Sequence, residues 1–419
     1  MNKIQASNPF FEIYSTPHGT VPFNLIKTEH YAPAIHEGIR RQNGEIDAII
    51  NNPDAPTFEN TIVPYEKSGE LLHRVNTVFG NLLSAETDDA LQELAREIMP
   101  LMSEHENNIS LNEKLFARIK TVYELADKAK LTPEQSKLLE DIYTGFVRNG
   151  ANLQGNAKEQ YRNLCKELSL LTLQFSENTL KETNDYRLVL TEKSQLSGLP
   201  ESAIDAAAET AQEKGVEGWV FTLHAPSYSP FMTYADNRDL RRELYMAYNT
   251  KCTHDNACNN LEIVKKIANI HMEIARLLGY DNFAEYNLKE RMAQNSDTVY
   301  KLLNQLLEAY TPTAQKEYDE VQALARSEEG ADFILMPWDW SYYSQKLKDR
   351  KFSINDEMLR PYFELSKVKE GVFGLASKLY GITFKKNADI PVYHKDVEAY
   401  EVFDKDGTYL AVLYTDFHP

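Results

Sequence analysis

The sequence lacks the features of a membrane-spanning protein or of a disulfide-stabilised one. Its 419 residues include three cysteines, Cys165, Cys252 and Cys258, which are too few and odd in number for a disulfide framework. No run approaches the roughly 18 apolar residues of a transmembrane helix. Residues 1–9 contain no apolar segment of signal-peptide length. We therefore expect a reduced, cytoplasmic protein with no membrane partner.

Positive charge is also scarce. The chain has 45 Lys and Arg against 63 Asp and Glu, which gives a net charge of −18. This balance argues against binding to a nucleic-acid backbone, so we expect no nucleic-acid partner. The hydrophobic fraction of 42% and the charged fraction of 26% are those of an ordinary globular protein, and the length allows two or three domains.

The helical zinc motif His-Glu-x-x-His is absent from the sequence. That motif needs histidines at positions i and i+4 of one helix, with a glutamate after the first as general base. His36 and His105 are each followed by Glu, but Arg40 and Ile109 occupy the positions of the second histidine. We expect both histidines to lie on helix surfaces. The sequence predicts no catalytic residue and no metal ligand in this chain.

One other group of potential metal ligands is present. Cys252, His254 and Cys258 lie within seven residues, and two thiolates with an imidazole are suitable ligands for zinc. Their spacing matches none of the common zinc-finger patterns, and the flanking asparagines are typical of an exposed loop. The loop interpretation is therefore favoured.

Helical periodicity dominates the chain. Thr132 followed by Pro133 and, two residues later, Gln135 predicts a helix start with a capping box. A second helix is predicted over residues 157–180. Apolar residues share one face of a further predicted helix: Val299, Leu302, Leu303, Leu306 and Tyr310.

Strand signals are few. Residues 186–191 and 218–224 predict a small sheet among helices, and residues 401–414 predict a hairpin turned by Asp406 and Gly407. The fold class is mainly α with minor β. A boundary near residue 150 divides an N-terminal helical region, 1–150, from a second region, 151–419, that holds the sheet and the terminal hairpin.

Two segments are candidates for peptide binding. The first is an aromatic group, Trp338, Trp340, Tyr342 and Tyr343, which is suited either to a peptide groove or to core packing. The second is the last predicted strand, with Tyr409, Leu410, Ala411, Val412 and Leu413. An exposed strand edge pairs with an extended peptide through backbone hydrogen bonds. A hairpin that pairs only within its own sheet is the alternative.

Several motifs together resemble one family. Residues 337–343, Pro-Trp-Asp-Trp-Ser-Tyr-Tyr, are similar to the Trp-Asp-x-x-Tyr-Tyr signature of the thimet-oligopeptidase and peptidyl-dipeptidase family of zinc peptidases. Residues 359–363 are similar to its following Pro-Tyr-Phe segment. Residues 55–61, 168–176 and 234–238 also resemble this family, so the resemblance begins at about residue 8 and covers nearly the whole chain. Bacterial peptidyl-dipeptidase, or dipeptidyl carboxypeptidase, is the branch that it resembles most.

The resemblance implies a two-lobed, largely helical ellipsoid with a deep channel that admits short peptides. In the family, a zinc-bound water attacks the scissile carbonyl, and the zinc ligands, the base and the last substrate contacts follow a Tyr-x-Asp segment. Residues 414–416 match that segment, and only three residues follow it. No catalytic residue can therefore be carried onto this sequence. For this sequence, the resemblance implies only the channel wall and the hairpin beside the cleft.

We therefore interpret the chain as the N-terminal portion of a zinc peptidyl-dipeptidase that releases dipeptides from the C-terminus of oligopeptides. Its expected partners are the oligopeptide substrate and the missing C-terminal, zinc-binding half. Alone, it is expected to bind no catalytic zinc and to be inactive. The alternatives are an oligopeptidase of the same family, a non-catalytic helical module that binds peptides or proteins, and a split enzyme whose zinc half is a separate chain.

Overall fold

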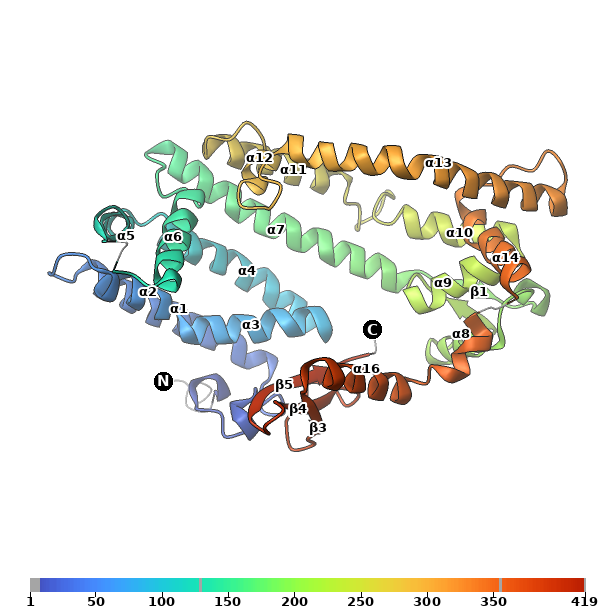
Figure 1. Cartoon of the computed structure of the whole chain (residues 1–419), viewed down its shortest axis with the longest axis horizontal. Coiled ribbons are helices and arrows are strands. Elements are labelled where there is room, and N and C mark those ends of the chain that lie inside the picture. Colours follow the sequence, from blue (N-terminus) through green and yellow to red (C-terminus); the bar gives the residue numbers. More distant parts are fainter. Residues whose placement is uncertain (1–7, 128–129, 354–355, 418–419) are drawn as a thin grey trace. The chain divides into compact units, whose positions relative to one another are not determined.

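The computed structural model describes residues 8–127, 130–353 and 356–417 (Figure 1). Helices form most of it, which confirms the predicted class of mainly α with minor β. The helices are α1 (Thr28–Ile50), α2 (Val63–Lys67), α3 (Glu70–Ala85), α4 (Asp89–Ser110), α5 (Glu113–Leu125), α6 (Pro133–Arg148), α7 (Asn156–Asp185), α8 (Glu201–Glu213), α9 (Ala225–Tyr234), α10 (Arg238–Asn249), α11 (Leu261–Leu277), α12 (Phe283–Leu288), α13 (Ser296–Glu329), α14 (Trp340–Phe352), α15 (Asp356–Leu359) and α16 (Leu365–Tyr380). Within the described ranges, no helix is both long and apolar enough to cross a bilayer.

The chain forms two compact units that are discontinuous in sequence. The first holds the chain up to Leu173, the segment Ile270–Tyr280 and the chain from Lys369 onward. The second holds Gln174–Asn269 and Asp281–Val368. These units are defined by contacts within the folded chain, and not by which segments fold independently. The expected division into 1–150 and 151–419 therefore stays a prediction.

The first unit is built around apolar faces of α1, α3 and α4. Its largest cluster of buried side chains includes Phe10, Tyr31, Ile35, Leu72, Val75, Phe79, Leu91 and Ile98. A second cluster joins α1 with α5 and α6 through Ile46, Ile49, Leu115, Ile119, Leu139 and Phe146. The 3.6-residue spacing of these side chains places them on one face of each helix, which is why helix-on-helix packing buries them.

Local capping chemistry explains where α6 begins. The side chain of Thr132 accepts a hydrogen bond from the Gln135 N–H, and the Gln135 side chain accepts one from the Thr132 N–H. This capping box satisfies two amide groups that the first helical turn leaves without a partner. Pro133 occupies the first turn, where its missing N–H costs nothing. The predicted helix start is confirmed.

The second unit contains a two-stranded antiparallel sheet among helices. In it β1 (Leu188–Leu190) pairs with β2 (Trp219–Phe221), with Val189 opposite Val220. The predicted strands at 186–191 and 218–224 are therefore confirmed as a pair, although both are shorter than expected. The sheet packs on α8, α9 and α10 through a buried cluster that includes Leu188, Leu190, Phe221, Leu223, Phe231 and Leu244.

The first unit also carries a three-stranded antiparallel sheet in the order β3-β4-β5. Its strands are β3 (Thr383–Lys386), β4 (Glu398–Phe403) and β5 (Tyr409–Thr415). The β4–β5 hairpin is the one predicted at 401–414. At its turn the Asp404 N–H donates to the Thr408 carbonyl at 2.8 Å, and Gly407 adopts a positive φ of 83° that favours glycine. The strand β3 was not predicted.

Candidate functional site

The candidate site is the outer edge of β5, which contains all five residues predicted to bind peptide. In the sheet order β3-β4-β5, β5 pairs with β4 on one side and with no other strand of the described part of the chain. Tyr409, Leu410 and Leu413 are exposed by 39%, 51% and 36%. An edge strand of this kind presents unpaired backbone N–H and C=O groups on its outer side. The sequence prediction of substrate contacts at these residues stays a prediction.

A bulge in β5 decides which side chains share a face of the sheet. Val402 of β4 lies opposite Ala411, whereas the next residue, Phe403, lies opposite Tyr409, so Leu410 is an extra residue in β5. In a regular strand with no bulge, Tyr409 would alternate onto the face of Ala411. Because of the bulge, Tyr409 joins the face that carries Val412 and Tyr414.

The segment before α1 covers that face. The imidazole of His18 stacks on the ring of Tyr409, with 3.8 Å between centroids and 2° between planes. Its Nε2 lies 2.6 Å from Oε1 of Glu401 on β4, and this hydrogen bond lowers the pKa of Glu401. Phe23 meets the ring of Tyr414 edge to face. The N-terminal segment therefore holds β5 in place across a long sequence separation.

Helix α16 covers the opposite face. Phe373 stacks on Phe384 of β3 at 4.3 Å and meets Tyr400 of β4 edge to face at 5.0 Å. Lys369 and Lys386 both contact the carboxylate of Glu398, which lowers its pKa to about 2. These contacts reach β3 and β4, whereas Leu413 of β5 stays 36% exposed. The outer edge of β5 is the side that is left for a backbone partner.

The aromatic group at 338–343 is mainly a packing element. Tyr342 and Tyr343 are buried beside Val321, Ala325 and Leu335 of their own unit. Their hydroxyl groups donate to Asp236 Oδ1 and Glu329 Oε1, each at 2.8 Å. Trp340 is 41% exposed. Core packing, rather than a peptide groove, accounts for the two tyrosines.

Asp339, within the same signature, organises the second unit. Its carboxylate is fully buried and accepts hydrogen bonds from Arg241 at 2.9 Å and from Arg238 at 2.7 Å. Arg241 is itself 1% exposed, and it also donates to the carbonyls of Ala235 and Trp338. Buried charges need this degree of pairing. The signature therefore joins α10 to the start of α14.

The predicted surface position of the two histidines is right for one and wrong for the other. His36 is exposed, while the following Glu37 pairs with Arg40. His105 is 4% exposed and lies 2.7 Å from Gln42 Oε1. Burial lowers the pKa of His105. The i, i+3, i+4 apolar pattern of α4 carries this histidine onto the packed side of the helix, where an amide supplies its hydrogen bond.

The loop with the two nearby cysteines packs against α7 of its own unit. Cys252 and Cys258 are buried free thiols, and burial and the nearby Glu182 raise the pKa of Cys252 to about 11. Asn260 accepts a hydrogen bond from Asn178 at 2.8 Å. Across the residues that the structure describes, no group of three His, Cys, Asp or Glu side chains is arranged to hold a metal ion.

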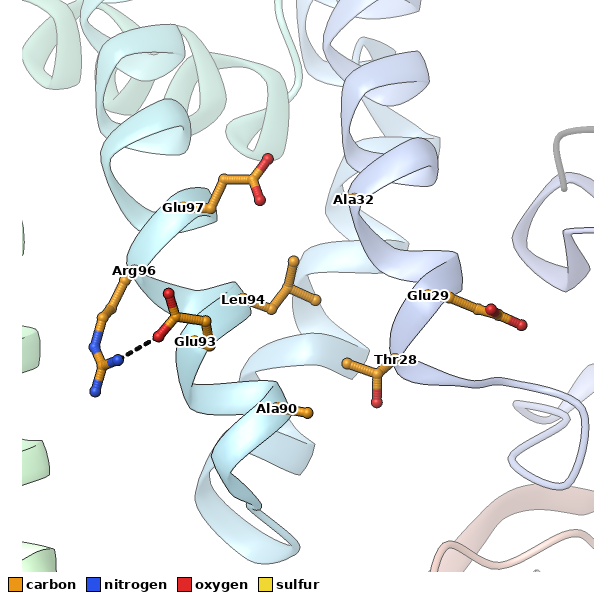
Figure 2. A pocket seen from close by; sticks show the side chains of 8 residues that line it. All are labelled: Thr28, Glu29, Ala32, Ala90, Glu93, Leu94, Arg96 and Glu97. Atoms are coloured by element: carbon orange, nitrogen blue, oxygen red, sulfur yellow. Dashed lines mark hydrogen bonds and ion pairs between the residues drawn. The ribbon is translucent and has the colours of Figure 1, made fainter. Parts of the chain in front are cut away.

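Figure 2 shows a pocket of about 510 Å³ between α1 and α4 in the first unit. The small side chains of Ala32 and Ala90 leave this space between the helices. Glu93, Glu97 and Glu29 line it, and Arg96 pairs with Glu93 on the same helix. An i, i+3 pair on an exposed helix is a common surface feature, so we assign no function to this pocket.

Comparison with known proteins supplies the context for these features. The sequence profile of peptidase family M3 matches residues 231–419. The chain is 35% identical over 412 residues to dipeptidyl carboxypeptidase from Escherichia coli, a match that covers 98% of this chain and 60% of that protein. It is 33% identical over 407 residues to oligopeptidase A from the same species, covering 96% and 60%. Saccharolysin from Saccharomyces cerevisiae is 25% identical over 403 residues, covering 90% and 56%.

The chain thus spans about 60% of the length of the first curated relatives that it matches. The profile match includes α10, the buried Asp339, α13, α16 and the β3-β4-β5 sheet. The relatives align with nearly all of the chain, including the helices before residue 231. These matches agree with the signature at 337–343: the chain is similar to peptidase family M3 over residues 231–419 and to the curated relatives over nearly its whole length.

Proposed function

We propose that this chain is the N-terminal portion of a peptidyl-dipeptidase, and that the outer edge of β5 binds the extended backbone of an oligopeptide substrate. The observation that carries this proposal is the geometry of β5, a partly exposed edge strand that pairs with β4 on one side and, among the described residues, with no strand on the other. The relatives named dipeptidyl carboxypeptidase support the reaction, which removes dipeptides from the C-terminus of a peptide.

Backbone pairing suits a peptidase that accepts varied sequences. Main-chain hydrogen bonds supply affinity for any extended peptide, whereas side-chain pockets supply specificity. At β5 the neighbouring side chains are apolar: Leu410 and Leu413 are both exposed beside the edge. They would contact substrate side chains without a charge requirement. This arrangement favours short, unfolded peptides over folded proteins, because only an extended segment can pair along the strand.

Peptidase family M3 is zinc-dependent. The sequence has no His-Glu-x-x-His, the pattern that places two zinc-binding histidines on one helix face. We propose that zinc is held by residues outside this sequence, on the C-terminal half of the enzyme or on a separate chain. The 419-residue chain alone should then bind peptide without cleaving it. A reduced, cytoplasmic location remains part of this proposal.

Isothermal titration calorimetry with a short peptide tests the binding role. A matched peptide carrying one backbone N-methyl group keeps every side chain but loses one donor and adds bulk at the paired edge. We expect the methylated peptide to bind roughly tenfold more weakly, as loss of about one hydrogen bond implies. Equal affinity for the two peptides would contradict pairing at β5. Chelator-sensitive cleavage by the 419-residue chain would contradict the proposed absence of zinc.

An oligopeptidase that cuts within peptides is the second candidate, because oligopeptidase A matches nearly as well as dipeptidyl carboxypeptidase. The products distinguish the two. When this chain is assembled with the zinc-binding portion, a peptidyl-dipeptidase releases successive dipeptides, and blocking the substrate's C-terminal carboxylate stops it. An oligopeptidase still cleaves the blocked peptide. Peptide binding with no hydrolysis in the assembled protein would favour a non-catalytic module.

A further inference from the structure

A tight turn in the segment before α1 holds His18 in a strained conformation. His18 has a positive φ of 57°, and the next residue, Gly19, has one of 67°. The Gly19 N–H donates to the Thr16 carbonyl at 2.9 Å, and the Thr20 hydroxyl donates to the Pro17 carbonyl at 3.0 Å. A left-handed backbone at a residue other than glycine costs free energy, and such residues are common at functional sites. Contacts of the imidazole offset this cost.

The imidazole contacts two strands of the three-stranded sheet at once. It stacks on Tyr409 of β5 and lies within hydrogen-bond distance of Glu401 of β4. These two interactions are here called the His18 contact. The bulge interrupts the register of β5 with β4 between Val402 and Phe403, so backbone pairing holds the Tyr409 end of β5 less firmly. Side-chain contacts therefore decide how well ordered this end of the edge strand is.

We propose that His18 is a positioning residue that holds the Tyr409 end of β5 in the conformation that pairs with a peptide, and that protonation of its imidazole strengthens this hold. The inference rests on the proposed function, in which β5 binds the substrate backbone. It adds a means of regulation by pH. A strand end that is already ordered binds more tightly, because the free energy of binding then includes a smaller ordering cost.

The charged groups around the imidazole set the sign of the pH effect. The hydrogen bond from His18 lowers the pKa of Glu401, and so does Lys385, which lies opposite Glu401 on β3. Burial raises the pKa of Tyr414, on the same face as Tyr409, so this phenol stays neutral. Glu401 therefore stays ionised over the range in which histidine gains its proton. An imidazolium donates a charge-assisted hydrogen bond to this carboxylate and is attracted to the face of the Tyr409 ring.

Hydrogen exchange and calorimetry on the 419-residue chain test both parts of the proposal. Exchange of the amides of residues 409–415 is measured at about pH 6 and about pH 8, and each rate is normalised to that of an unfolded chain at the same pH. We expect roughly threefold to tenfold greater protection at the lower pH, because charge about doubles the strength of one hydrogen bond. An N-acetylated alanine peptide, which has no group that titrates in this range, should bind more tightly at the lower pH by a similar factor.

Three substitutions separate this role from a general structural one. Glu401→Gln keeps an acceptor for the imidazole but removes the charge, so both pH differences should disappear. His18→Asn keeps a residue type that tolerates a positive φ but lacks the ring and its charge, and it should also weaken peptide binding at the lower pH. His394→Gln is the control. His394 lies 3.6 Å from the carboxylate of Asp396 in the same unit, and its loss should leave both pH differences unchanged.

Equal protection of β5 at the two pH values would overturn the proposal, and so would pH differences that persist in Glu401→Gln and His18→Asn. The N-methylated peptide tests the proposed function separately, at a single pH. If the native chain prefers the unmethylated peptide while neither substitution alters its affinity, the role of His18 is wrong and the peptide site at β5 stands. If protection of β5 follows the His18 contact but the two peptides bind equally, the proposed function is wrong, and regulation of it by His18 falls with it.

Discussion

At the residue scale, the stability of the second unit depends on the buried ion pair between Asp339 and Arg241. The carboxylate of Asp339 is fully buried and compensates Arg241, which is 1% exposed. Replacing Asp339→Ala leaves that guanidinium buried without a counter-charge. We expect a loss of about 3–5 kcal/mol in the free energy of unfolding, as when one partner of a buried ion pair is removed. Urea denaturation followed by circular dichroism measures it.

An exposed ion pair serves as the control for that substitution. Lys137 and Asp141 pair on the surface of α6, where both side chains are more than half exposed. Asp141→Ala should change the free energy of unfolding by less than about 1 kcal/mol. The double substitution Arg241→Met and Asp339→Leu removes both charges of the buried pair. It should recover most of the free energy of unfolding that Asp339→Ala loses, because neither partner is then left buried without its counter-charge. A small effect of Asp339→Ala alone would show that water reaches Arg241.

Glu398 makes the stability of the first unit depend on pH. Contacts with Lys369 and Lys386 lower its pKa from 4.5 to about 2. A carboxyl group whose pKa is lowered in the folded state stabilises the fold above its unfolded pKa, and this contribution is lost as the pH falls. The difference in unfolding free energy between the native chain and Glu398→Gln should therefore shrink as pH drops from about 5 toward 2. A difference that stays constant over this range would refute the assignment.

At the scale of elements, the close approach of α1 and α3 depends on Gly38. A Cβ atom at this position would lie 2.9 Å from the backbone Cα of Leu72, which cannot move without shifting the helix. Gly38→Ala should therefore destabilise the chain by about 1–3 kcal/mol despite alanine's better helix propensity. Gly44→Ala on the same helix is the matched control.

That control has the opposite expected sign. A Cβ at Gly44 meets no atom within 4 Å. Its substitution should therefore stabilise the chain by roughly 0.5–1 kcal/mol through helix propensity alone. Thermal unfolding of Gly38→Ala and Gly44→Ala measures the change in stability that each substitution causes. Equal effects at the two glycines would mean that the helices separate easily, and that the contact at Leu72 does not hold α1 against α3.

Elements with strong local signals were predictable from the sequence. The Thr132 capping box and the Asp-Gly turn at 406–407 act over a few residues, so their neighbours in sequence are enough to specify them. The strand β3 was missed because its four residues follow α16 closely and contain two lysines, which weakens the alternation signal. The bulge at Leu410 was also missed, since only pairing with β4 defines it.

At the scale of the whole molecule, contacts between distant segments limited the prediction. His18 and Glu401 are 383 positions apart, and nothing in the sequence near His18 indicates that it stacks on the candidate strand. The buried position of His105 likewise depends on Gln42, which belongs to another helix. The fold class followed from helical periodicity, whereas the two discontinuous units depend on long-range packing.

Each of the two units exposes an apolar helix face, and this leads to a prediction for the 419-residue chain as a whole. The second unit has Leu303 and Leu307 of α13, which are 51% and 64% exposed, and the first has Val372 and Leu375 of α16, which are 57% and 58% exposed. Such faces bind hydrophobic dyes, while the net charge of −18 keeps copies of the chain apart. The folded monomer should therefore enhance the fluorescence of anilinonaphthalene sulfonate.

Charged substitutions show where the dye binds. Leu303→Lys with Leu307→Lys should remove one part of the fluorescence, and Val372→Lys with Leu375→Lys a second part. The two losses should add, because sites without shared contacts behave independently. Glu308→Lys, which changes charge on the polar side of α13, controls for electrostatic attraction of the anionic dye. If the fluorescence survives both double substitutions, the dye reports loosened packing elsewhere, and these two faces are not the apolar surface that it detects.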